Sequence, residues 1–412
     1  MHKESFCIVL FILYLLSACS HEQDITSSAG NITAIDSLIQ KAVDEENIPG
    51  GVIRIQQGDS LLHYKAYGFA QKYEYGLEPL VNPKEMTPAH IFDLASLTKV
   101  FATTYGIMLL TDLGEIAIDD PIQKYLPEFS EGAKGEITIR HLLAHSSGLA
   151  QWFPLYYKAS DKKSRLKVIS EMPLKWTVGE ARHYSDLGFM LLGDIIEKVS
   201  GRSLDQFLTE ALYQPLDLHY STFNPLQKGL ENIAATSHGN PFEKRMVYED
   251  DFGYEVDVQP ESWDGWREYT LIGEVNDGNA WYANNGVAGH AGLFSTAKDL
   301  QKLLNLLLDR GRFDGKQIIG QDVIDTFLTK DQYGNGLGWA MDKSTISARG
   351  TPDGTFGHTG FTGTNVVIIP ENDLTIIFLT NRQNVGLLDD GTYFNLNPLR
   401  QEIVDIVIEI IL

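Results

Sequence analysis

Patterns typical of β-strands lie at both ends of this 412-residue chain, and patterns typical of helices fill its middle. Near the N-terminus, Val52 to Gln57 and Leu61 to Ala66 flank a short Gly-containing loop that suits a hairpin. Near the C-terminus, Val366 to Ile369 and Leu374 to Thr380 are apolar, β-branched runs. We therefore expect an α/β fold of the α+β type: an antiparallel sheet made by both chain ends, flanked by helices, with an inserted helical sub-domain.

The helical patterns of the middle are clearest in four segments, Ser96 to Leu113, Leu187 to Val199, Leu204 to Leu212 and Ala297 to Leu308. A further helical pattern closes the chain from Leu399 to Leu412. The segment Asn224 to Ala283 shows little periodicity, which predicts a long loop region over one face. Such loops often bind substrate, but they are also simply variable.

The net charge of the chain is −22, with 43% hydrophobic and 21% charged residues. This hydrophobic and charged content is that of an ordinary soluble globular protein. A chain this acidic is repelled by phosphate backbones, so we expect no nucleic-acid partner. The acidity itself indicates no particular substrate.

The N-terminus resembles the signal of a bacterial lipoprotein. Phe6 to Leu16 is an apolar run too short to span a bilayer, and it ends in Leu16-Ser17-Ala18-Cys19, which resembles a lipobox. This predicts a signal peptide over residues 1–18, a tether over 19–30 and a folded domain over 31–412. An ordinary secretory signal, with Cys19 incidental, is the alternative.

Lipid on Cys19 would attach the protein to a membrane surface without a spanning helix. The expected location is then the bacterial cell envelope, facing the periplasm or the cell surface. The only other cysteine, Cys7, lies in the predicted signal. After cleavage, disulfides, thiol catalysis and a cysteine-ligated metal are therefore excluded.

The pattern Ser96-x-x-Lys99 stands at the start of an apolar helix. Residues three apart on a helix are neighbours, so Lys99 lies beside the Ser96 hydroxyl, where it can help activate a nucleophile. The helix N-terminus adds a backbone N–H for a developing oxyanion. Taken alone, the same pattern also fits Ser96 as a helix cap and Lys99 as a surface residue.

Two further motifs follow in order, Tyr184-Ser185-Asp186 before an apolar helix and His358-Thr359-Gly360 before the C-terminal strand pair. With Ser96-x-x-Lys99 they resemble the three active-site elements of the penicillin-recognising serine hydrolases, which include class C β-lactamases, DD-peptidases and related esterases. The segments Ile137 to Leu149 and Gly286 to Thr296 are also similar to that family. The resemblance runs from about residue 35 to about residue 408.

The resemblance implies a role for each motif. Ser96 attacks a carbonyl and becomes acylated, Lys99 and Tyr184 share general-base and general-acid duty, and His358–Gly360 forms an edge strand that lines the substrate. The backbone N–H groups of Ser96 and Phe361 form the oxyanion hole. No metal and no cofactor are implied.

The expected substrate is a cell-wall-derived peptide that ends in D-amino acids. An ester or small amide is the enzymatic alternative, and a non-catalytic protein that binds cell-wall fragments is a rival from another class. The oligomeric state is left open.

The motifs depart from the commoner family pattern at two positions. Asp186 stands where asparagine is frequent; an ionised aspartate only accepts hydrogen bonds, and it favours a protonated Lys99, which weakens Lys99 as a base. His358 stands where the family pattern often has lysine. An imidazole that is only partly cationic binds a substrate carboxylate less strongly than a lysine would. We therefore expect no efficient β-lactamase activity, and a substrate that carries an amine is an open possibility.

Other polar and aromatic residues have structural explanations. His141, His145 and His290 lack HExxH-type spacing, so packing and hydrogen bonding are predicted for them in place of metal binding. Four aromatic residues follow the Ser-Gly-Leu segment and either wall the substrate site or pack in the core: Trp152, Phe153, Tyr156 and Tyr157.

Overall fold

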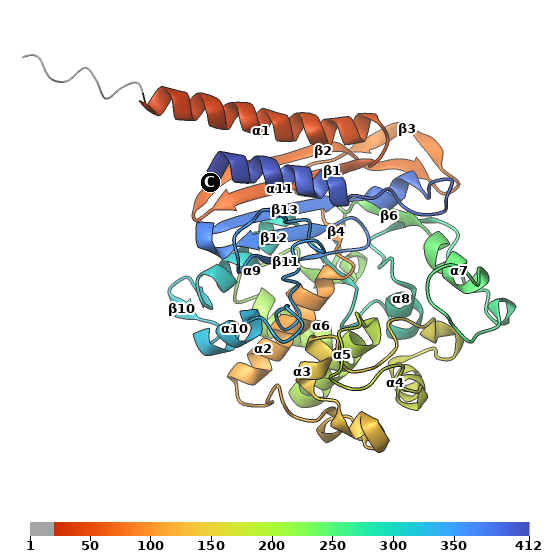
Figure 1. Cartoon of the computed structure of the whole chain (residues 1–412). Helices are drawn as coiled ribbons and strands as arrows, with labels where there is room; N and C mark the ends of the chain where they lie inside the picture. Colours follow the sequence, from red (N-terminus) through yellow and green to blue (C-terminus); the bar gives the residue numbers. More distant parts are fainter. Residues whose placement is uncertain (1–19, 412) are drawn as a thin grey trace, which may run out of the picture.

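Both ends of the chain form one six-stranded antiparallel sheet, with strands in the order β11-β12-β13-β1-β2-β3 (Figure 1). The computed structural model describes the backbone of residues 20–411 and the side chains of residues 32–411. β1 pairs with β13 at the centre, where Ile55 lies opposite Ile376. The predicted sheet is confirmed. Its strands are β1 Gly50–Gln57, β2 Ser60–Glu74, β3 Glu78–Glu85, β11 Phe356–Thr359, β12 Asn365–Ile369 and β13 Leu374–Thr380.

The two faces of the sheet are covered by different helices. Successive side chains of a strand point to opposite faces; Ile377 therefore belongs to the large central core, whereas Ile376 belongs to a second core on the outer face. Helices α1 (Ser20–Asp44) and α11 (Asn397–Ile411) lie side by side over that outer face (Figure 1). This double burial explains why β13 reads as a continuous apolar run.

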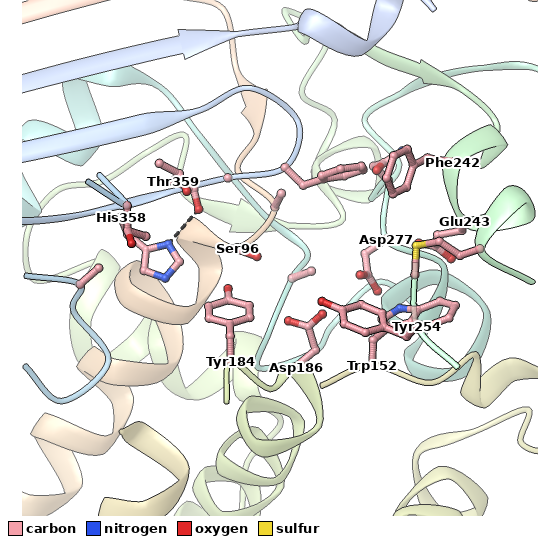
Figure 2. A pocket seen from close by; sticks show the side chains of 18 of the residues that line it. Ser96, Trp152, Tyr184, Asp186, Phe242, Glu243, Tyr254, Asp277, His358 and Thr359 are labelled. Atoms are coloured by element: carbon pink, nitrogen blue, oxygen red, sulfur yellow. Dashed lines mark hydrogen bonds between the residues drawn. The ribbon is translucent and has the colours of Figure 1, made fainter. Parts of the chain in front are cut away.

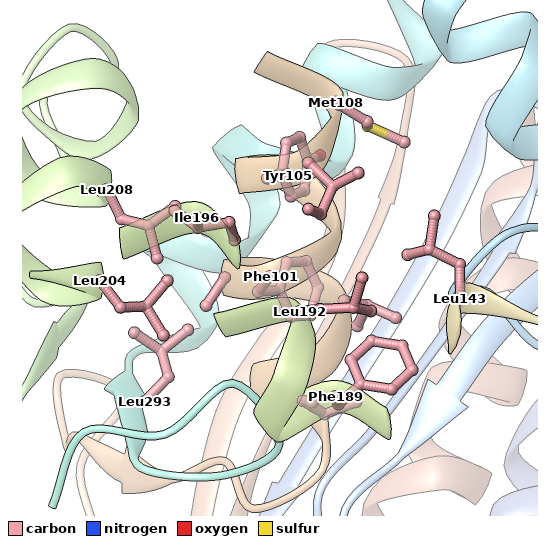
Figure 3. Close-up of a cluster of buried hydrophobic side chains, with 14 of the residues drawn as sticks. Phe101, Tyr105, Met108, Leu143, Phe189, Leu192, Ile196, Leu204, Leu208 and Leu293 are labelled. Carbon is pink, nitrogen blue, oxygen red and sulfur yellow. The ribbon is translucent and has the colours of Figure 1, made fainter. Parts of the chain in front are cut away.

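The other face carries the helical middle of the chain. Helix α9 packs directly on the sheet, and α2, α5 and α6 surround a cluster that includes Phe101, Tyr105 and Leu192 (Figure 3). The helices of this region are α2 Tyr105–Asp112, α3 Ile139–Leu143, α4 Lys162–Glu171, α5 Asp186–Ser200, α6 Leu204–Leu208, α7 Pro241–Tyr248, α8 Gly278–Asn284, α9 Ala297–Leu308 and α10 Gln321–Leu328.

The described residues also form three small sheets of short strands. They are β4 Phe92–Asp93, β5 Thr222–Phe223 and β8 Leu293–Ser295 in one small sheet, β6 Ala235–His238 with β7 Thr270–Ile272, and β9 Arg312–Phe313 with β10 Lys316–Gln317.

The long loop predicted for Asn224 to Ala283 is wrong in part, because this segment contains β6, α7, β7 and most of α8. Its elements are short and are held by contacts between distant residues, which leave no periodic pattern in the sequence. The buried Arg267, for example, donates to Asn240 Oδ1 and to the carbonyl oxygens of Val275 and Asn276, at 2.9–3.2 Å. The helix predicted from Ser96 also differs, since a π-helical stretch, Lys99–Thr104, precedes α2.

The predicted signal peptide and Cys19 lie outside the described residues. Helix α1 begins at Ser20, so the predicted tether falls largely on helical backbone, and its role as a tether stays a prediction. Among the helices described, none is long and apolar enough to cross a bilayer.

Candidate active site

Ser96 is presented by a sharp turn between β4 and the helical stretch that follows. Ala95 adopts a φ of 46°, a strained backbone conformation for a residue with a Cβ. The buried Asp93 holds this turn, because its carboxylate accepts from the Ala95 N–H at 2.9 Å, and its own carbonyl accepts from the Thr362 hydroxyl at 2.7 Å. The strain is thus offset by hydrogen bonds to the segment that follows β11.

Lys99 is completely buried beside Ser96. Its Nζ lies 3.0 Å from Ser96 Oγ, 2.7 Å from an Asp186 carboxylate oxygen and 3.1 Å from the carbonyl oxygen of His290. Burial alone would lower the pKa of Lys99, but the Asp186 carboxylate outweighs it and holds that pKa above its usual range. The ammonium donates hydrogen bonds to Ser96 Oγ and to the His290 carbonyl oxygen, and its charge is paired with Asp186. Lys99 is therefore an ammonium, as the sequence predicts.

Tyr184 lies beside Lys99 and His145. Lys99 Nζ is 4.9 Å from the centre of the Tyr184 ring, and the His145 ring stacks on Tyr184 with centroids 4.3 Å apart. His145 Nδ1 accepts from the Ser185 N–H at 2.9 Å, which fixes the turn that carries Tyr184. Burial holds the pKa of His145 well below its usual range, so this ring is neutral.

His358 is a buried residue of β11. Burial, with the nearby Lys99 charge, lowers the pKa of His358 to about 3. Its Nδ1 lies 2.8 Å from the Thr359 carbonyl oxygen, which can only accept, so Nδ1 carries the proton. The sequence predicts a partly cationic imidazole, but in the structure the ring is neutral throughout the ordinary working range of pH.

Ser96 and Phe361, whose backbone N–H groups are the expected oxyanion donors, both border the same cavity. Neither of them donates a hydrogen bond to any residue in the part of the chain that the structure describes. The Phe361 carbonyl, in contrast, accepts from Arg382 and Gln383. The two N–H groups are therefore available for an oxyanion, as the resemblance implies.

These groups line a cavity of about 530 Å³ with Ser96 near its middle (Figure 2). One side, here called the strand wall, consists of Arg182, His358, Thr359 and Gly360. The opposite side, here called the loop wall, consists of Trp152, Phe242, Glu243, Tyr254 and Asp277 (Figure 2). Phe361 joins the two, with its ring 5.0 Å from that of Phe242.

The loop wall carries two carboxyl groups in different protonation states. Burial, together with the charge of Asp277, raises the pKa of Glu243 well above its usual range. Glu243 accepts from the Gly278 N–H at 2.7 Å and from the Tyr156 hydroxyl at 3.2 Å. Burial opposes ionisation of Asp277 too, but His290, at 2.8 Å, outweighs it, and the pKa of Asp277 is lowered. Asp277 therefore stays ionised, whereas Glu243 retains its proton into higher pH.

The structure brings all the predicted catalytic and substrate-binding residues together: Ser96, Lys99, Tyr184, Asp186, His358, Thr359, Gly360 and Phe361. Of the four aromatic residues left open, Trp152 borders the cavity, Phe153 packs in the central core, and Tyr156 and Tyr157 pack under the loop wall. Sequence analysis missed Arg182, Glu243 and Asp277. Only the nearness of Arg182 to Tyr184 in sequence was a signal for any of them.

The three histidines do not form a metal site. His145 stacks on Tyr184 and His290 pairs with Asp277, in agreement with the predicted packing and hydrogen-bonding roles. Among the side chains described, no three His, Cys, Asp or Glu residues are arranged to hold a metal ion.

Known sequences and structures are similar to nearly the whole chain. The family model described as Beta-lactamase matches residues 35–395. An N-acetylmuramyl-L-alanine amidase of Bacillus subtilis (strain 168) is 32% identical over 384 residues, covering 88% of this chain and 83% of that protein. A protein of Escherichia coli (strain K12), provisionally named a D-alanyl-D-alanine carboxypeptidase, is 33% identical over 380 residues, covering 87% and 84%.

Two solved structures show the same fold. EstCE1, a hydrolase with promiscuous acyltransferase activity, has a TM-score of 0.66 at 20% identity, and the match covers 93% of this chain and 99% of that one. A class C beta lactamase from Rhodobacter sphaeroides has a TM-score of 0.64 at 20% identity, covering 92% and 99%. They support the fold class predicted from the sequence.

Proposed function

The chain belongs to the beta-lactamase family and is a serine hydrolase, and from that premise we propose that it cleaves cell-wall-derived peptides ending in D-amino acids through an acyl-enzyme on Ser96. The observation that carries this proposal is the contact of the buried Lys99 ammonium with Ser96 Oγ at 3.0 Å, at the edge of a cavity. A serine hydroxyl held in this way is poised for nucleophilic attack.

Acylation begins with loss of the Ser96 proton. Lys99 is already an ammonium paired with Asp186, so Tyr184, whose oxygen points toward Ser96 in Figure 2, takes that proton as a phenolate and becomes a neutral phenol. Ser96 Oγ attacks the carbonyl carbon, and the oxyanion receives the N–H groups of Ser96 and Phe361. Tyr184 returns the proton to the leaving amine as the C–N bond breaks. Water then attacks the ester of the acyl-enzyme by the same steps, and the acid product is released.

The cell-wall substrate is supported by the names of the two relatives and by the carboxyl-bearing, aromatic cavity. A peptide ending in D-Ala-D-Ala tests it. We expect the wild-type protein to release D-alanine, while Ser96→Ala and a matched peptide ending in L-Ala-L-Ala give no release. Hydrolysis of p-nitrophenyl acetate without release of D-alanine from any D-peptide would favour the esterase alternative.

A second candidate is cleavage of the amide between a muramyl sugar and L-alanine. The loop wall favours it, because Trp152, Tyr254 and Phe242 offer aromatic faces beside carboxyl groups that can bond sugar hydroxyls. One substrate, an N-acetylmuramyl pentapeptide, contains both bonds. Loss of D-alanine in the product mass indicates a carboxypeptidase, and a free pentapeptide indicates an amidase.

We also propose export and anchoring through Cys19, which the lipobox-like residues 16–19 support. In a bacterial host, the full-length protein should fractionate with membranes and carry lipid on Cys19. The Cys19→Ala variant should lose both properties. A wild-type protein that stays in the cytoplasm would overturn this proposal without affecting the enzymatic one.

A further inference from the structure

A substrate that ends in a free carboxylate needs a cation in the cavity, and most of the candidate cations are already occupied. Lys99 donates to Ser96 Oγ and to the His290 carbonyl oxygen and forms an ion pair with Asp186, and His358 is neutral. Arg382 donates to the carbonyl oxygens of Phe394 and Phe361. Lys99 and Arg382 are therefore tied to neighbouring groups of the fold; Arg382 Nε has no partner among the described residues, but this atom is buried.

Arg400 is also committed to the fold. It is 6% exposed, and its terminal nitrogens donate to the Thr364 carbonyl oxygen at 3.0 Å and to Asn397 Oδ1 at 3.3 Å. Its guanidinium therefore joins α11 to the turn after β11.

Arg182 differs from all of these. Its half-buried side chain borders the cavity, its guanidinium carbon lies 5.9 Å from the centre of the Tyr184 ring, and its charge acts on His358. Among the described residues its guanidinium makes no hydrogen bond and no ion pair. Burial lowers the pKa of Arg182, and the charges of Asp331 and Asp342 act on it only at longer range. Partial burial of an unpaired cation is unfavourable, so this group is poised for a partner that enters the cavity.

We propose that Arg182, the cation at the cavity without a partner among the described residues, binds the carboxylate of the substrate's leaving group. A guanidinium offers parallel N–H donors that match the two oxygens of a carboxylate. The strand wall then binds the departing amino acid and the loop wall binds the acyl part. This inference rests on the proposed acyl transfer at Ser96, and it applies to the release of a C-terminal amino acid.

The test uses substrates that differ only in that carboxylate. One pair is an acylated D-Ala-D-Ala peptide and its C-terminal amide; the second is the corresponding D-lactate ester and its lactamide. The variants are Arg182→Ala and Arg182→Lys. Arg202→Ala, an exposed arginine that pairs with Glu210 and does not border the cavity, is the matched control.

We expect Arg182→Ala to lower kcat/KM for the carboxylate substrates about tenfold to a hundredfold and to change it less than about threefold for the amides. Arg182→Lys should recover part of the preference, and Arg202→Ala should match the wild type. Equal losses on both members of a pair would mean that Arg182 acts only through Tyr184, and would overturn the inference. So would a wild-type protein without preference for the carboxylate.

Failure of the proposed function gives a different result. If Ser96→Ala cleaves the substrates as fast as the wild type, the nucleophile is wrong. The inference about Arg182 is then tested by binding alone, since the acid should bind more tightly than its amide to the wild type and equally to Arg182→Ala.

Discussion

The two walls of the cavity differ in charge and in how they are built. The strand wall combines the backbone of β11, a neutral imidazole and an unpaired guanidinium, whereas the loop wall combines aromatic rings with two carboxyl groups. In the strand wall, His358 and Thr359 belong to the sheet, whose hydrogen bonds fix them, whereas Arg182 lies in the loop before α5. The loop wall belongs to short elements held by side-chain contacts. The difference indicates that the strand wall and the floor between the two walls, here Ser96, Lys99, Tyr184 and Asp186, carry the chemistry, and that the loop wall selects what is acylated.

The largest expected effect is on the floor that both walls share. Lys99→Met should lower kcat/KM about a thousandfold or more, because the variant loses the ammonium that contacts Ser96 Oγ. The loss should be similar for a muramyl peptide and for p-nitrophenyl acetate. Steady-state kinetics measures it, with near-UV circular dichroism as a check on folding. A loss confined to the large substrate would contradict the assignment of Lys99 to the floor.

Asp186→Asn tests which form of Lys99 is active. The Asp186 carboxylate raises the pKa of Lys99, so its removal makes deprotonation of Lys99 easier. We expect kcat/KM to fall about tenfold at neutral pH for both substrates, with a new loss on the alkaline side of the pH profile. An increase in activity would show that the free amine is the working form, and that Tyr184 is not the base.

Trp152→Ala tests the loop wall separately from the floor. Trp152 borders the cavity and lies near Tyr254, with ring centroids 6.3 Å apart. Removal of this ring should raise KM for a muramyl peptide about five- to tenfold and leave p-nitrophenyl acetate hydrolysis unchanged. An equal effect on the small ester would mean that the loop wall supports the catalytic groups as well.

His358→Gln tests the neutral state of the strand wall. The pKa of His358 is lowered to about 3, so the wild-type kcat/KM profile should show no inflection from this residue near its ordinary value of about 6.5. The variant should keep the shape of that profile, with a loss of only a few fold. An acidic limb near pH 6.5 that disappears in His358→Gln would contradict the assignment of a neutral ring.

Glu243→Gln should have the smallest effect on activity and a visible effect on stability. The folded-state pKa of Glu243 is raised, so the folded protein holds this proton where the unfolded chain has lost it. Stability from this group is present at low pH and declines as the pH rises above the ordinary glutamate value. The free energy of unfolding of the variant, relative to that of the wild type, should rise by about 1 kcal/mol from about pH 5 to about pH 8, measured by urea unfolding. An unchanged difference across that range would contradict the raised pKa.

The same comparison explains what the sequence could predict. The strands β1 and β13 were recognisable because they are short, apolar, β-branched runs bounded by turn residues. Helix α9 was predicted to the residue, since Thr296 caps its first turn and its apolar face repeats regularly. The floor and strand wall were found because Ser96, Lys99, Tyr184 and the His358 triplet are arranged in short motifs with set chemical roles.

The loop wall could not be predicted in this way. Glu243 and Asp277 are 34 residues apart, and only tertiary contacts such as that of Glu243 with the Gly278 N–H bring them together. Arg182 was overlooked for a different reason. Arg182 is of interest because it has no partner among the described residues and because His358 is neutral. Neither property can be recognised from a local sequence pattern.

The most direct test of the central claim is the mass of the protein during turnover. The wild-type protein and Ser96→Ala are mixed with an acyl-D-Ala-D-lactate substrate, quenched in acid within milliseconds to seconds, and examined by intact mass and peptide mapping. We predict a mass increase equal to the acyl group on the peptide that contains Ser96, in the wild type only. Turnover with an acyl group on another residue, or turnover by Ser96→Ala, would contradict the account.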